Sequence, residues 1–127
     1  MTGARVLVVE DNEKNMKLFR DVLQAKGYET LEATTGDDAI TLALEHSPAL
    51  VLMDVQLPGM SGVEALARLR SDERTASIPV LALTAQAMQG DRERFLAEGF
   101  DGYLAKPVDI VELLTTVQDY CDGERGE

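Results

Sequence analysis

Five polar side chains in this sequence each follow a short apolar run, and together they could bind a metal ion and a phosphoryl group. Carboxylates that lie close together repel one another unless a cation neutralises them. Carboxylate oxygens are also the ligands that Mg²⁺ prefers, usually together with several waters. A carboxylate beside Mg²⁺, with an ammonium and a hydroxyl aimed at the same point, is suited to accept a phosphoryl group. The five residues are Glu10, Asp11, Asp54, Thr84 and Lys106.

These side chains can act together only if the fold brings the ends of the apolar runs to one place. Three runs are continuously apolar, which is typical of strands buried on both faces of a parallel sheet. Weaker strands are expected at 28–33 and 102–105, and stretches with helical periodicity separate the strands. The alternation predicts an α/β fold, (βα)5, with one doubly wound, five-stranded parallel sheet. The apolar runs are 6–9, 50–53 and 78–83; the helical stretches are 13–26, 37–45, 62–70, 88–98 and a last helix with its stripe at Ile110, Leu114, Val117 and Cys121.

The topology of such a sheet also predicts where a site lies. Ligands bind beyond the carboxyl ends of the strands, at the point where the strand order reverses. With the order 2-1-3-4-5, the first and third strands are neighbours, so Glu10, Asp11 and Asp54 meet in one pocket. Thr84 and Lys106 are expected on its far side. Without a nearby His or Cys, this oxygen-rich pocket favours Mg²⁺ over Zn²⁺ or Cu²⁺.

Composition limits the class of protein. The chain has 127 residues and a formal net charge of −11, with a single Cys. We expect one domain over residues 1–121, followed by a short polar tail at 122–127. The negative charge, without a basic cluster, argues against direct nucleic-acid binding. One Cys excludes an intrachain disulfide, and neither a signal peptide nor a membrane span is indicated, so we expect a cytoplasmic protein with no membrane partner.

Four motifs in order make the whole chain resemble the receiver domains of two-component response regulators. Each motif stands at the end of an expected strand. The resemblance implies a flavodoxin/CheY-like fold and a phosphoprotein controlled by phosphorelay signal transduction. The motifs are Val8-Val9-Glu10-Asp11-Asn12, Asp54-Val55-Gln56-Leu57-Pro58 with Gly62 eight residues after Asp54, Leu83-Thr84-Ala85 and Leu104-Ala105-Lys106-Pro107.

Carried over to this sequence, the resemblance implies a role for each residue of the metal site. Asp54 would be the phosphoacceptor, carrying an aspartyl phosphate in the active form. Asp11, Asp54 and the backbone carbonyl of Gln56 would be the Mg²⁺ ligands, and Glu10 would contribute mainly through water.

The resemblance also implies a phosphate-sensing group. Thr84 and Lys106 would contact the phosphoryl group, and Tyr103 matches an aromatic switch position whose ring moves when Thr84 is drawn toward the phosphate. A half-buried strand aromatic is the alternative interpretation of Tyr103. The bond between Lys106 and Pro107 is expected to be cis, as is typical of the family.

The expected function is that of a single-domain response regulator. Asp54 would receive a phosphoryl group from a sensor histidine kinase or a histidine phosphotransfer protein. The face formed by the fourth helix, the fifth strand and the last helix would then change its affinity for a downstream protein partner. The chain would not be an enzyme in the ordinary sense, although it would take part in its own phosphorylation and dephosphorylation. Its sequence is most similar to stand-alone regulators of cell polarity and division.

Two alternatives share part of this pattern. The same acidic opening occurs in receiver domains of hybrid histidine kinases, from which a chain like this could be excised. A Mg²⁺-dependent phosphatase with an Asp nucleophile would use a similar pocket, but it needs an acid/base Asp two residues after the nucleophile. This sequence has Gln56 there, so the phosphatase is the less favoured alternative.

Overall fold

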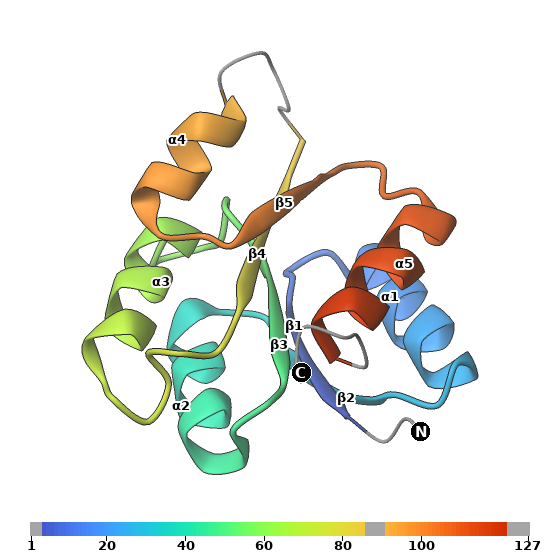
Figure 1. Ribbon diagram of the computed structural model, residues 1–127, viewed down its shortest axis with the longest axis horizontal. Coiled ribbons are helices and arrows are strands. Elements are labelled where there is room, and N and C mark those ends of the chain that lie inside the picture. Colours follow the sequence, from blue (N-terminus) through green and yellow to red (C-terminus); the bar gives the residue numbers. More distant parts are fainter. Residues whose placement is uncertain (1–3, 86–90, 122–127) are drawn as a thin grey trace.

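A computed structural model describes residues 4–85 and 91–121, in which five strands alternate with five helices (Figure 1). The strands are β1 (Arg5–Val9), β2 (Glu29–Ala33), β3 (Leu50–Asp54), β4 (Val80–Thr84) and β5 (Gly102–Ala105). The helices are α1 (Glu13–Ala25), α2 (Gly36–His46), α3 (Gly62–Ser71), α4 (Asp91–Glu98) and α5 (Ile110–Cys121). All strands are parallel and lie in the order β2-β1-β3-β4-β5, which confirms the predicted fold class and strand order.

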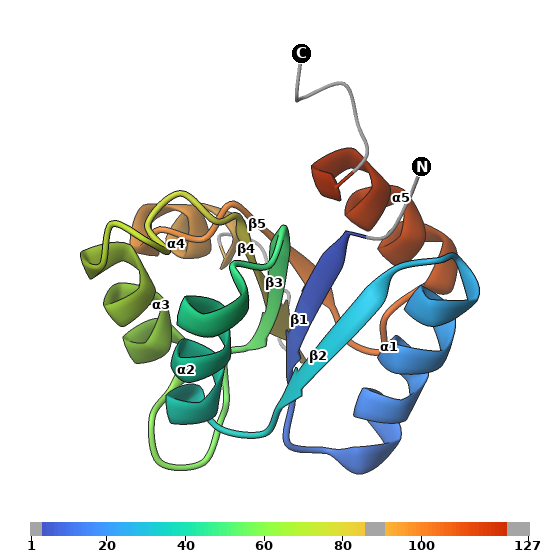
Figure 2. The same cartoon turned by 90° about the horizontal axis from the view of Figure 1, so that it is seen from below.

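The sheet lies between two layers of helices. Helices α1 and α5 cover one face, and α2, α3 and α4 cover the other (Figures 1 and 2). The packing of strand β1 explains why its sequence does not alternate between polar and apolar residues. Val6 and Val8 pack against the α1–α5 layer, while Leu7 and Val9 pack against the α2–α3 layer. Each of these four residues therefore enters an apolar layer, and the central strands β3 and β4 are buried throughout.

Helix caps fix where α1 and α3 begin, after the loops that leave the sheet. The Asn12 side chain accepts a hydrogen bond from the Asn15 N–H and begins α1. Ser61 and Glu64 form a reciprocal capping box at the start of α3. Such caps satisfy backbone donors that the first helical turn leaves unpaired. They end the two loops that follow β1 and β3, next to the acidic residues at the ends of these strands.

The last helix differs from the prediction. Ile110 was expected in its apolar stripe but is 46% exposed, and Leu113 is fully buried in its place. Both choices satisfy a helical period, and the sequence pattern does not fix which face turns inward. The buried stripe passes through Leu113 and Val117, which pack against the α1 side of the sheet. Asp109 caps the start of this helix, because the Glu112 N–H donates to Asp109 Oδ1 at 3.0 Å.

Some element boundaries differ from the sequence expectations by one or two residues. Strands β3 and β5 begin at the expected residues, whereas β2 begins one residue later and β4 two residues later than expected. The expected helical residues 88–90 and the expected tail at 122–127 lie outside the described residues. Within residues 4–85 and 91–121, no helix is long and apolar enough to span a bilayer.

Candidate functional site

Three carboxylates meet at the carboxyl edge of the sheet. Glu10 follows β1, Asp54 is the last residue of β3, and Asp11 begins the loop into α1. Each offers an oxygen within 4.8 Å of the others. Glu10 and Asp54 are 1% and 5% exposed, whereas Asp11 is open to solvent. The predicted convergence of these residues is therefore present, with two carboxylates buried and one facing water.

Lys106 supplies the positive charge inside this cluster. Its Nζ lies 2.7 Å from Asp54 Oδ2 and 2.9 Å from Glu10 Oε1. Burial disfavours the charged form of Lys106, but the contacts with Asp54 and Glu10 outweigh that effect and raise the pKa of the ammonium above its usual value of 10.5. The Lys106 N–H donates to Thr84 O at 2.8 Å, and the peptide bond to Pro107 is cis, as expected. The side chain reaches across from β5 and contacts the carboxylates directly.

Backbone donors hold the two buried carboxylates in place. The Gln56 N–H donates to Asp54 Oδ1 at 2.8 Å, which leaves Oδ2 to Lys106. The Asn12 N–H donates to Glu10 Oε2 at 3.2 Å. Asn12 thus orients a site residue and caps α1, a double role that sequence reasoning missed. Its position directly before a helical stretch, two residues after Glu10, is the signal that could have revealed it.

Gly62 allows the loop after β3 to fold back on itself. Its N–H donates to Val55 O at 3.1 Å. A Cβ at this position would lie 2.5 Å from Asp54 O and 2.7 Å from Val55 Cα, and both of these are backbone atoms. Only glycine permits so close an approach. The spacing of eight residues between Asp54 and Gly62 therefore has a steric cause next to the candidate acceptor.

Thr84 lies at the same edge of the sheet, whereas Tyr103 faces another part of the molecule. Thr84 ends β4, which pairs with β3, and it is buried. Tyr103 is half-buried in β5, and its ring centroid lies 6.0 Å from that of Phe95 in α4. Tyr103 therefore connects β5 with α4. Phe95 is buried in α4 and packs against Tyr103, the expected switch residue. Sequence reasoning did not single out Phe95.

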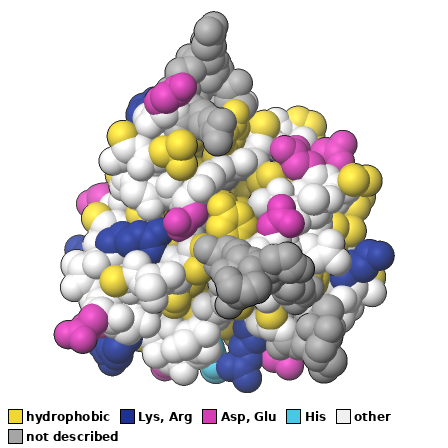
Figure 3. Space-filling model, in the orientation of Figure 1, with side chains coloured by type: hydrophobic (Ala, Val, Ile, Leu, Met, Phe, Trp, Pro, Cys, Tyr) yellow, Lys and Arg dark blue, Asp and Glu magenta, His cyan; other side chains and the backbone are white. Residues whose placement is uncertain are grey.

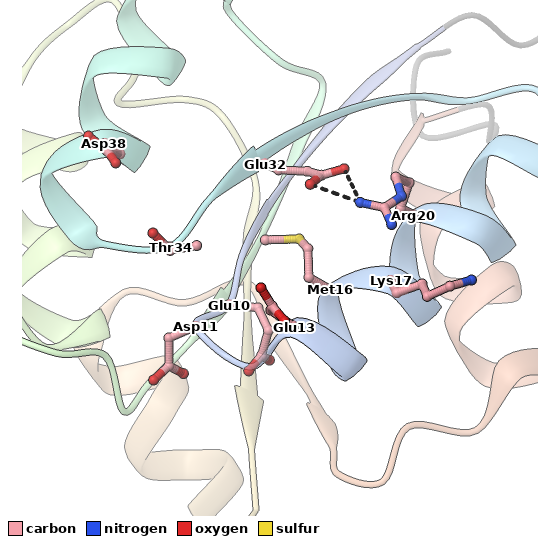
Figure 4. Close-up of a pocket in the computed structure, with 9 residues that line it drawn as sticks. All are labelled: Glu10, Asp11, Glu13, Met16, Lys17, Arg20, Glu32, Thr34 and Asp38. Atoms are coloured by element: carbon pink, nitrogen blue, oxygen red, sulfur yellow. Dashed lines mark hydrogen bonds and ion pairs between the residues drawn. The ribbon is translucent and has the colours of Figure 1, made fainter.

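A cavity lies beside the cluster, between α1 and the carboxyl ends of β1 and β2. Its volume is about 480 Å³. Figure 4 shows Met16 projecting into it and carboxylates around it. Two cations line the cavity too, but Arg20 is paired with Glu32 at 3.1 Å and Lys17 with Asp21 at 2.6 Å. The approach to Glu10 and Asp11 is therefore strongly acidic, which favours entry of a cation over an anion.

The donor set fits a hard divalent cation. Glu10 Oε1 is buried and has no hydrogen bond, and its only close partner among the described residues is the Lys106 ammonium. A single ammonium cannot balance three carboxylates, and every candidate ligand of the cluster is a carboxylate oxygen. Mg²⁺ prefers such oxygen ligands, and an exposed residue such as Asp11 leaves room for waters.

Comparison with known proteins agrees with this geometry. The family model of the response regulator receiver domain matches residues 6–118. The chain belongs to this family. Its relatives include the polar-differentiation response regulator DivK of Brucella ovis, which is 49% identical over 115 residues, covering 91% of this chain and 94% of DivK.

Two solved structures bear on the chemistry of this receiver domain. The receiver domain of sensor histidine kinase PA1611 from Pseudomonas aeruginosa has a magnesium ion coordinated in its active site cleft. It is 36% identical, with a TM-score of 0.85, covering 93% of this chain and 97% of that one. The receiver domain of Saccharomyces cerevisiae Ssk1, in complex with the histidine phosphotransfer protein Ypd1, is 29% identical. Its TM-score is 0.86, covering 94% of this chain and 89% of that chain. The chain is thus a DivK-like receiver domain of two-component signalling.

Proposed function

We propose that this receiver domain accepts a phosphoryl group on Asp54 from a phosphohistidine. The observation that carries the proposal is the arrangement of Asp54 itself. One of its oxygens is fixed by the Gln56 N–H, and the other lies 2.7 Å from the Lys106 ammonium. The donor would be a sensor histidine kinase or a histidine phosphotransfer protein. The complex of the similar Ssk1 receiver with Ypd1 supports this class of partner.

The transfer is an in-line displacement at phosphorus. A carboxylate oxygen of Asp54 forms the new O–P bond while the P–N bond of phosphohistidine breaks, and the bonding electron pair stays on the imidazole nitrogen. Lys106 contacts the phosphoryl oxygens and neutralises their charge, and the Thr84 hydroxyl donates a hydrogen bond to them. Hydrolysis of the same acyl phosphate returns Asp54 to its free form, so the chain takes part in both halves of its own cycle.

Mg²⁺ is the proposed cofactor. Asp11, Asp54 and the backbone carbonyl of Gln56 would hold it, and Glu10 would act mainly through water. When bound, the ion supplies positive charge to the phosphoryl oxygens. The acidic cluster of this chain and the magnesium ion in the PA1611 receiver support this assignment.

The output is a change in protein binding. A phosphoryl group adds negative charge at the carboxyl edge of the sheet and draws Thr84 toward it. Tyr103, which packs on Phe95 of α4, then changes position, and the face formed by α4, β5 and α5 changes its affinity for a downstream protein. The similarity to DivK supports a role in cell polarity or cell-cycle control.

Intact mass spectrometry tests the proposal. Wild type and Asp54→Asn are incubated with acetyl phosphate, with and without Mg²⁺. We expect one added phosphoryl group on wild type with Mg²⁺ and none on the variant. Beryllofluoride binding, followed by NMR, covers the case in which the adduct hydrolyses quickly. A chain that neither gains mass nor binds beryllofluoride would contradict the proposal, and sustained hydrolysis of para-nitrophenyl phosphate would favour a phosphatase.

A further inference from the structure

Among the residues that the structure describes, strand β5 is an edge of the sheet, and one row of its backbone groups has no strand partner. Within the described residues, no strand pairs with β5 on the side opposite β4. The Lys106 N–H donates to Thr84 O, so the alternation of a parallel ladder directs the backbone of Leu104 to β4 as well. The N–H and C=O groups of Tyr103 and Ala105 therefore point to the open edge. Such an edge is a template for an added strand.

A groove of about 430 Å³ runs along this edge, between β5 and α5. Its β5 side is formed by Gly102, Tyr103 and Ala105, so small side chains leave the backbone accessible at both ends of the strand. Its α5 side is one stripe of residues spaced four apart, Glu112, Thr116 and Tyr120. In Figure 3, which shows this side of the molecule, hydrophobic side chains near the centre lie between acidic ones.

The charges of the groove are uneven along its length. Tyr120 donates to Asp101 O at 3.3 Å, which places that end of α5 beside the start of β5. The Asp101 carboxylate is paired with Arg70 at 2.8 Å. Glu112, at the opposite end of the stripe and so nearer Ala105, has no ion pair among the described residues. The groove therefore has one uncompensated negative charge, at its Glu112 end.

We infer that this groove binds an extended peptide segment of a partner protein, which adds to β5 as a sixth strand and places a Lys or Arg side chain against Glu112. Main-chain hydrogen bonds to Tyr103 and Ala105 supply the register, and an apolar side chain of the segment lies over Gly102 beside Tyr120. The inference names the partner of the α4–β5–α5 face, so its link to signalling rests on the proposed function. Tyr103 belongs to both the groove and the expected switch.

The first test identifies peptides and how they bind. A phage-displayed library of random 12-residue peptides is selected on the full chain, and enriched peptides are synthesised. Amide hydrogen exchange by NMR then compares free and bound protein. We expect at least about tenfold slower exchange at Tyr103 and Ala105, while Leu104, whose N–H already pairs with β4, stays unchanged and serves as the internal control. Protection spread over α4 and α5 without these two amides would overturn the inference, as would peptides that bind as helices.

The second test addresses the charge. Glu112→Lys reverses the charge facing the groove, and Asp119→Lys makes the same change at an exposed position of α5 that does not line it. For a peptide with a basic residue, we expect Glu112→Lys to weaken binding about fivefold, and Asp119→Lys less than twofold. Equal effects would overturn the inference, as would failure to select any peptide that binds more tightly than about 1 mM. The same wild-type sample is also tested for the phosphoryl adduct by intact mass. A sample that binds the peptide but gains no phosphoryl group would contradict the proposed function and leave the groove inference intact.

Discussion

Replacing Lys106 with Met should show how much the buried ammonium stabilises this fold. Met keeps most of the apolar stem but removes the charge, so the side chain still fills its space. The Glu10 and Asp54 carboxylates, whose side chains are 1% and 8% exposed, then face each other with no cation between them. Among substitutions that remove one charge from this site, we expect Lys106→Met to be the most destabilising.

The magnitude follows from burial. Removing one partner of a buried ion pair costs about 3–5 kcal/mol, because the remaining charge stays desolvated. The Lys106 side chain is 19% exposed, and Asp11 opens the cluster to water on one side, which places the loss at the lower end. We therefore expect the free energy of unfolding to fall by about 3 kcal/mol. For a chain of this length, that corresponds to a melting temperature lower by about 10 °C.

Urea denaturation in EDTA and in 10 mM Mg²⁺ provides the measurement. The matched control is Lys17→Met, because the Lys17–Asp21 pair is as short, at 2.6 Å, yet its side chains are 68% and 53% exposed. We expect the control to lose less than about 1 kcal/mol. Mg²⁺ should restore part of the loss in Lys106→Met, since the ion supplies the missing positive charge. A loss below about 1 kcal/mol in EDTA, equal to that of the control, would refute the reasoning from burial.

Three further predictions test the same site. Mg²⁺ should stabilise wild type, by about 1.4 kcal/mol at 10 mM if its Kd is about 1 mM, and Asp54→Asn should lose at least half of this effect in the same urea titrations. Gly62→Ala should destabilise the fold by about 2 kcal/mol or more and slow phosphoryl acceptance, because its Cβ meets backbone at 2.5 Å; unchanged stability would contradict this. Because the pKa of Lys106 is raised in the folded state, the stability difference between wild type and Lys106→Met should be constant from pH 7 to about 10. It should shrink as the pH rises through the folded pKa, above 10.5, and a decline that begins near neutral pH would contradict the assignment.

The sequence was sufficient to predict the fold and the meeting of the carboxylates for one physical reason. Continuous apolar strands require cover on both faces, and parallel strands bring all their carboxyl ends to one edge. Once the strand order is 2-1-3-4-5, Glu10 and Asp54 must be neighbours, whatever the details of packing. The position of the candidate site therefore follows from the chain topology and does not depend on any single side chain.

Features that depend on side-chain packing were not accessible in this way. The inward face of α5 was assigned to Ile110 instead of Leu113, because both fit a helical period. Arg70 also escaped notice, although its guanidinium donates to Ile78 O at 2.6 Å and to Asp101 Oδ2 at 2.8 Å. Asp101 lies 31 residues away in sequence, and no local pattern indicates such a contact. The same applies to Tyr103 and Phe95, whose packing joins β5 to α4.

The positions of the buried polar side chains distinguish residues of the candidate site from a residue with a purely structural role. Within the described residues, four polar or charged side chains are buried: Glu10, Asp54, Thr75 and Thr84. Thr75 has a structural explanation, because its hydroxyl donates to Leu69 O at 2.6 Å just beyond the end of α3. The other three lie together at the carboxyl edge of the sheet, where apolar residues would avoid the desolvation of two carboxylates. A fold that keeps acidic groups buried at that edge, beside an ammonium held between them, is less stable than it could be. The phosphoryl chemistry proposed for Asp54 requires that arrangement.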